Sequence, residues 1–263
     1  MYVNENELAP NAVLRLRART AFLKFGWGKP ILGFVVPCSI TCAVMIIILR
    51  AAAAISGVSE VIMSGNFQDA LEQQEYIYNT FLRLSAATMV ISALLAFLGV
   101  GMTKFFIELA RGNTPTIKVL FSFFNKWHFC AALMLARTAA ELLTAAPALL
   151  AEYLLPSYLI LHMILNLVGF VARIYIVLRL CLAVCVYADN PNDGVIFAIR
   201  RSLALMGNRS LPSKVFLLVL SFVPWLILAS FTCGVGVLFV LPYLFLTFAH
   251  FYDEVRVKAR NEM

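Results

Sequence analysis

Residues 31–54 read ILGFVVPCSITCAVMIIILRAAAA, an apolar run in which Arg50 is the only charged residue. A helix needs about 20 apolar residues to cross the hydrocarbon layer of a membrane. This run meets that length. It also begins too far along the chain, behind five basic residues, to be an ordinary secretory signal. Residues 31–54 therefore predict a membrane-spanning helix.

The composition of the whole chain agrees with this prediction. Of the 263 residues, 62% are hydrophobic and only 13% are charged. Soluble proteins are roughly half apolar and about a quarter charged. A core of this size cannot hide so much apolar surface, so lipid must cover the remainder. The composition excludes a water-soluble globule and predicts an all-α polytopic membrane protein.

The same length criterion predicts six transmembrane helices. Only residues 232–234 separate the last two, and small side chains there and at Gly236 permit a tight turn and therefore a helical hairpin. The expected spans are approximately residues 31–54, 84–107, 128–151, 158–186, 214–231 and 235–252.

The distribution of basic residues predicts the orientation, because connections rich in Lys and Arg stay in the cytoplasm. The segment before the first span holds five basic residues, whereas the next connection, residues 56–78, holds four acidic residues and no Lys or Arg. The later connections continue this alternation. Both termini are therefore expected in the cytoplasm, in a multi-pass protein of a cytoplasmic membrane.

These spans divide the chain into three parts. Residues 1–30 form a cytoplasmic amphipathic segment, residues 31–252 the six-helix transmembrane domain, and residues 253–263 a short basic cytoplasmic tail. The net charge of +7 comes from short basic groups between apolar segments. The positive-inside rule accounts for such groups, so nucleic acid is not an expected partner.

Three cytoplasmic stretches combine apolar residues at helical spacing with Lys or Arg, as helices in the headgroup layer do. They are residues 8–25, 114–127 and 193–206, and residues 66–79 on the outer side are a fourth candidate. Basic side chains near an anionic surface attract its lipids. The candidate anionic-lipid contacts are Arg15, Arg19, Lys118, Arg200 and Arg201.

The strongest candidate for a functional site is a polar set within spans three and four. A short outer link joins these spans, so they should be antiparallel neighbours, and Arg137 and Glu141 share one face at i, i+4 spacing. Ionisable residues inside a membrane usually face a partner or a watery cavity. Two hypotheses stay open, a structural ion pair or the lining of a ligand or ion pathway. The set comprises Arg137, Glu141, Asn166 and Arg173.

The thiols and imidazoles predict no catalytic or metal site. Cys38 and Cys42, and Cys181 and Cys185, are i, i+4 pairs that could bind a soft metal. Zinc sites usually show tighter Cys spacing, and isolated Cys packs well in apolar helices. The chain has no phosphate loop, metalloprotease motif or hydrolase motif. We therefore expect no catalytic residue, no metal and no cofactor, and a protein that is not an enzyme.

Short motifs in the C-terminal third resemble those of a known family. They are Tyr187-Ala188-Asp189-Asn190-Pro191, Leu205-Met206-Gly207-Asn208, Pro224-Trp225, Gly234-Val235-Gly236 and Phe251-Tyr252, with Ala110-Arg111-Gly112 earlier in the chain. Together they resemble the bacterial integral membrane family catalogued as domain of unknown function 975. The resemblance covers most of the chain. It implies a helical protein of the bacterial cytoplasmic membrane and no mechanism.

These observations favour a non-enzymatic function, as an accessory subunit or a lipid-interacting protein. Its expected partners are membrane lipids and, as a second candidate, another membrane protein. The alternative is a small transporter with a polar path between helices three and four. A polar, water-filled cavity ending near Glu141 would favour transport, whereas an exposed apolar groove would favour the accessory or lipid-binding role.

Overall fold

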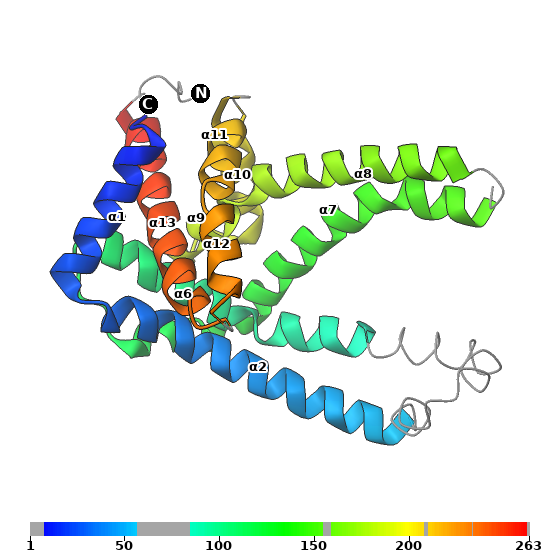
Figure 1. Cartoon of the computed structure of the whole chain (residues 1–263), viewed down its shortest axis with the longest axis horizontal. Coiled ribbons are helices and arrows are strands. Elements are labelled where there is room, and N and C mark those ends of the chain that lie inside the picture. Colours follow the sequence, from blue (N-terminus) through cyan, green and yellow to red (C-terminus); the bar gives the residue numbers. More distant parts are fainter. Residues whose placement is uncertain (1–7, 57–84, 155–158, 208–209, 233, 262–263) are drawn as a thin grey trace.

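The computed structural model describes residues 8–56, 85–154, 159–207, 210–232 and 234–261. Every regular element in these ranges is a helix (Figure 1), which confirms the expected all-α fold. Besides a helix at Ser85–Leu94, the elements are α1 (Asn11–Phe25), α2 (Gly28–Ser56), α6 (Ala96–Ala110), the 3-10 helices η2 (Ile117–Phe121) and η3 (Phe124–Lys126), α7 (Trp127–Leu154), α8 (Leu159–Leu180), α9 (Ala183–Asp189), α10 (Gly194–Leu205), α11 (Ser210–Leu220), α12 (Val223–Ser230) and α13 (Val237–Asn261).

Among the described residues, four segments are long and apolar enough to cross a membrane. A fifth arises if Ser85–Leu94 and α6, which meet at a bend of 46°, form one broken span. These segments overlap the first five expected spans. The sixth, residues 235–252, lies in α13, whose apolar part ends at Asp253 and is shorter than the about 20 residues of a span. The four segments are Gly28–Ile48, Ile117–Pro147, Met163–Asp189 and Ser210–Ser230.

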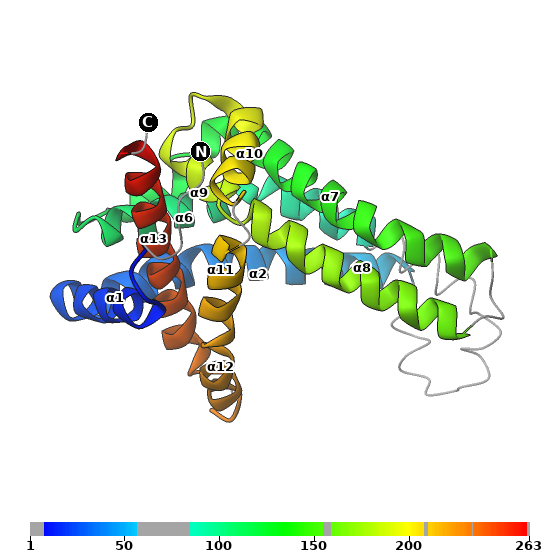
Figure 2. The same ribbon diagram turned by 90° about the horizontal axis from the view of Figure 1, so that it is seen from above.

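The long helices fall into two groups in space (Figures 1 and 2). The helices α2, Ser85–Leu94, α7 and α8 extend toward one side, and α11, α12 and α13 run across them. The expected inner ends of the first group meet the second group. The six expected spans therefore do not share one direction in this structure.

The centre of the molecule is α6, which packs against α2, α7, α9, α13 and η2. Buried side chains of α6 point to several sides of this helix. Those at most 4% exposed are Leu98, Val100, Phe105, Phe106, Ile107 and Leu109.

The helices α7 and α8 form the antiparallel hairpin that the sequence predicts (Figure 1). A Cβ atom added at Gly169 of α8 would lie 3.0 Å from the Thr144 carbonyl oxygen of α7, so the two backbones approach closely. One turn further along, Arg173 contacts Glu141 in the same register. Small residues and an ion pair therefore fix how the two helices are aligned.

The predicted interfacial helices are present at two of the three inner stretches, as α1 and α10. The apolar face of α1 packs against α13 through Leu14, Ala18 and Phe22, where the sequence analysis expected lipid. The expected helix over residues 114–127 is wrong, because this stretch forms only η2 and η3, with Leu120 and Phe123 buried in the core. The outer candidate, residues 66–79, lies outside the described residues.

The contact between α6 and η2 depends on Gly101. A Cβ atom added at Gly101 would lie 2.0 Å from the carbonyl oxygen of Leu120. The same atom added at Gly99, two residues earlier in α6, would meet no atom within 4 Å. The backbone of η2 therefore lies directly on the backbone of α6.

Gly101→Ala is expected to lower the melting temperature of the purified protein in detergent. The new methyl group would push η2 away from α6, and such overpacking typically costs about 1 to 3 kcal/mol. Gly99→Ala is the matched control and should melt at or above the parent, because Ala is favoured over Gly in a helix by about 1 kcal/mol. Equal melting of the two variants would contradict the close contact.

Candidate functional site

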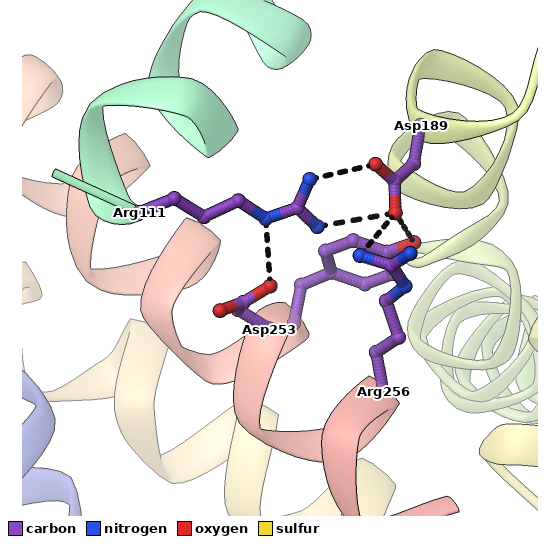
Figure 3. A network of polar contacts seen from close by, with 5 residues as sticks. Arg111, Asp189, Asp253 and Arg256 are labelled. Atoms are coloured by element: carbon purple, nitrogen blue, oxygen red, sulfur yellow. Dashed lines mark hydrogen bonds and ion pairs between the residues drawn. The ribbon is translucent and has the colours of Figure 1, made fainter. Parts of the chain in front are cut away.

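A polar cluster around the carboxylate of Asp189 joins three helices (Figure 3). Arg111 donates from Nη1 to Oδ1 at 2.8 Å and from Nη2 to Oδ2 at 3.1 Å. Arg256 Nη1 lies 2.9 Å from Oδ2, and the hydroxyl of Tyr252 donates to the same oxygen at 3.2 Å. Arg111 also donates from Nε to Oδ1 of Asp253 at 2.9 Å. We call these five residues the Asp189 cluster.

Local backbone structure places each member of the Asp189 cluster. The helix α6 ends at Ala110, and Gly112, with φ at +88°, turns the chain away beyond Arg111. Such a positive φ suits glycine, which has no Cβ. Asp189 is the last residue of α9, while Asp253 and Arg256 share a face of α13 at i, i+3 spacing. Two helix ends and one helix face therefore converge at the cluster.

The charges in the Asp189 cluster balance, with two guanidinium groups facing two carboxylates. The side chain of Asp189 is 9% exposed, and that of Arg111 is 26% exposed. The hydrogen bonds from Arg111 to Asp189 raise the pKa of Arg111 above its ordinary value, although burial acts in the opposite direction. Bidentate Arg–carboxylate pairs are strong and directional. The cluster is therefore suited to holding helices together, and its acids and bases are already engaged with one another.

Hydropathy and local spacing do not predict the Asp189 cluster as a site. Arg111 and Asp189 stand within motifs that resemble the family, and Asp253 and Arg256 fall in the expected basic tail. In the structure this tail continues the helix α13 as far as Asn261. The signal that could have found the cluster is the presence of both Arg111 and Asp189 in those short motifs.

The polar set predicted in spans three and four comes together in part. Arg137 donates from Nε to Oε1 of Glu141 at 3.2 Å, and Arg173 donates from Nη2 to Oε2 of Glu141 at 3.1 Å. One carboxylate thus bridges two arginines on α7 and α8. Asn166 is exposed on α8, two turns before Arg173 and therefore about 10 Å away along the helix.

A cavity of about 1180 Å³ lies beside these residues. Its walls come from α2, α6, α7, α8, α9, α10, α13 and the helix Ser85–Leu94. Most lining side chains are apolar, among them Val100, Phe106 and Phe245. Of the described residues that line the cavity, only Arg137 and Arg179 are charged. The cavity is therefore mostly apolar, and its charged lining groups are two guanidinium groups.

The candidate lipid contacts lie on three separate elements, with Arg15 and Arg19 on α1, Lys118 on η2, and Arg200 and Arg201 on α10. Arg19, Lys118 and Arg200 are exposed, and Arg15 and Arg201 are partly buried. Helices that present basic and apolar side chains together are typical of lipid headgroup surfaces. The large apolar side chains exposed beside them are Leu16 and Leu23 on α1, Ile117 and Phe121 on η2, and Ile196 and Phe197 on α10.

The cysteines form no metal site in the part of the chain that the structure describes. No group of three or more His, Cys, Asp or Glu residues lies close enough there to hold a metal ion. Cys130 and Cys185 are buried in the apolar interior. This placement fits the packing role that the sequence analysis favoured.

Asp189→Asn is expected to destabilise the protein more than Asp253→Asn. Asn cannot neutralise Arg111 and Arg256, and breaking a fully buried pair costs about 3 to 5 kcal/mol. Because the arginines here are partly exposed, we expect about 2 to 3 kcal/mol for Asp189→Asn. Asp253→Asn removes one exposed contact and should cost at most about 1 kcal/mol. Thermal unfolding of both variants in detergent measures the difference, and equal losses would refute the central position of Asp189.

Comparison with known proteins gives a family match over nearly the whole chain. The model of the family described as "Protein of unknown function (DUF975)" matches residues 14–259. No curated protein and no solved structure matches the chain significantly. The match includes the segments that carry Arg111, Glu141, Asp189 and Arg256. The chain therefore belongs to the DUF975 family of proteins of unknown function.

Proposed function

We propose that this chain is a non-enzymatic, lipid-interacting protein of the bacterial cytoplasmic membrane that holds a lipid in the cavity between α2, α6, α7 and α8. The observation that carries the proposal is the nature of the cavity walls, which are mostly apolar. Small-molecule sites usually measure about 300 to 1,000 Å³. The cavity of about 1180 Å³ exceeds this range and has room for a larger apolar ligand.

The surroundings of the cavity support a ligand that comes from the bilayer. The helices α7 and α8 expose large apolar side chains along their length, including Leu143 at 75% and Ile160 at 75%. Lipid must cover such surfaces in a membrane protein. A lipid can therefore approach the cavity along the same helices that the bilayer already surrounds.

The transporter alternative has weaker support. Arg137 and Arg173 both pair with Glu141, and Glu141 and Arg173 are not among the residues that line the cavity. A path for a polar solute needs polar walls that replace the water around that solute. An apolar chamber favours a lipid over a polar solute.

The topology that we propose has six spans and both termini in the cytoplasm. Several described contacts join positions that the charge distribution assigns to the cytoplasm, which supports one common inner face. Six spans and four spans both leave the two termini on the same side. Five spans would separate them, which the contact between Arg17 and Glu254 argues against. These contacts are Arg17–Glu254, Arg111–Asp253, Lys126–Asn192 and Lys214–Leu8.

Cysteine labelling tests this topology. In a variant without native cysteines, Glu72→Cys should react with an impermeant thiol reagent outside intact cells, and Lys118→Cys should not. Val235→Cys, between the last two expected spans, should also react from outside. An unreactive Val235→Cys beside a reactive Glu72→Cys would leave four spans, with α11 to α13 at the inner surface. Labelling of Lys118→Cys from outside would reverse the orientation.

Ala140→Phe tests the lipid site, because Ala140 lines the cavity and a phenyl ring there would occupy its space. We expect this variant to keep about half as much phospholipid as the parent, or less, after gentle purification. Mass spectrometry of the intact protein measures the bound phospholipid. Ala139→Phe is the matched control, since Ala139 is exposed on α7 and does not line the cavity. If both variants retain the parental amount of lipid, the cavity is not the lipid site.

A further inference from the structure

We propose that the cavity selects an anionic lipid, whose charged headgroup lies between Arg137 and Arg179 and whose chains lie along the apolar walls. This inference rests on the proposed function, which assigns a lipid of any charge to the same cavity. The charge, the register and the hydrogen bonding of the two arginines indicate the chemical class of the lipid headgroup.

The charge around the cavity is positive. Arg137 and Arg179 line it, and the described lining residues include no Asp or Glu. Arg137 contacts the carboxylate of Glu141, which it shares with Arg173. One carboxylate therefore neutralises only part of the charge of three guanidinium groups. An anionic ligand would complete the neutralisation.

The register of α7 and α8 brings Arg137 and Arg179 to one level. The antiparallel pairing of Glu141 with Arg173 puts residue 177 of α8 opposite Arg137. Arg179 follows two residues later, which is about 3 Å along the helix axis. Both residues line the same cavity. One headgroup can therefore reach both guanidinium groups.

Both guanidinium groups keep hydrogen-bond donors for a ligand. A guanidinium has five N–H donors. Within the described residues, Arg137 donates from Nε to Glu141, and Arg179 donates from Nη1 to the hydroxyl of Tyr175. Arg179 also lies over the Tyr175 ring, 5.5 Å from its centroid, which orients the side chain. The remaining N–H groups match the oxygen atoms of a phosphate.

The apolar walls distinguish a lipid from a small free anion. Val100, Phe106 and Phe245 face the space beside the arginines, and neither a phosphate nor another small ion would cover them. Acyl chains would cover this apolar surface and keep it from water. A cationic end beside an apolar chamber therefore matches an amphiphile with a negative headgroup.

The test measures lipid selectivity of the full-length protein in detergent. The protein is incubated with equal amounts of phosphatidylglycerol, which is anionic, and phosphatidylcholine, which is zwitterionic, and the bound lipids are counted by mass spectrometry of the intact protein. The parent should prefer phosphatidylglycerol. Arg179→Gln and Arg137→Gln should each reduce this preference about tenfold, which corresponds to about 1.4 kcal/mol. Arg179→Lys keeps the charge and should keep most of the preference.

Arg50→Gln is the matched control, because Arg50 is an exposed arginine of α2 that does not line the cavity. It should leave the preference unchanged. If Arg179→Gln and Arg137→Gln keep the parental preference while Ala140→Phe lowers total lipid, the inference is overturned and the proposed function stands. If Ala140→Phe leaves total lipid unchanged, the proposed function itself fails. An equal loss of preference in Arg50→Gln would assign the selectivity to general surface charge and also overturn the inference.

Discussion

The arrangement of the helices around α6 depends on the contacts of the Asp189 carboxylate. This carboxylate accepts hydrogen bonds from Arg111 at the end of α6 and from Tyr252 on α13, and it pairs with Arg256. Since α6 is the central helix and α13 carries α1 on its surface, this one side chain connects most of the packed elements. The same helices supply Phe106 and Phe245 to the cavity walls. The shape of the cavity therefore depends on a contact outside it.

Hydropathy and length predict the helices because the physical cause of helix formation is local in the sequence. A run such as residues 31–54 forms a helix in lipid wherever it lies in the fold, since its backbone must satisfy its own hydrogen bonds. The pairing of α7 with α8, and the contact of Arg137 with Glu141, follow from a short link and from i, i+4 spacing. These parts of the fold and of the candidate site could be predicted from the sequence.

The Asp189 cluster could not be predicted in this way, because its partners are far apart along the chain. Arg111 lies 78 residues from Asp189 and 142 residues from Asp253. Local spacing does not say which arginine meets which carboxylate. The same limit explains α1, whose apolar face fits either lipid or protein, and packs on α13 in the structure. Only the assembled fold decides between the two surroundings.

The position of α13 in the chain has a consequence for biogenesis. Among the described residues, three of the six ion pairs include Asp253, Glu254 or Arg256. A ribosome makes these residues after the segments that carry Arg17, Arg111 and Asp189. The apolar segments before α13 are therefore complete while three of these six ion pairs still lack one partner. The ion pairs that join Arg17, Arg111 and Asp189 to α13 can thus form only after α13 has been made.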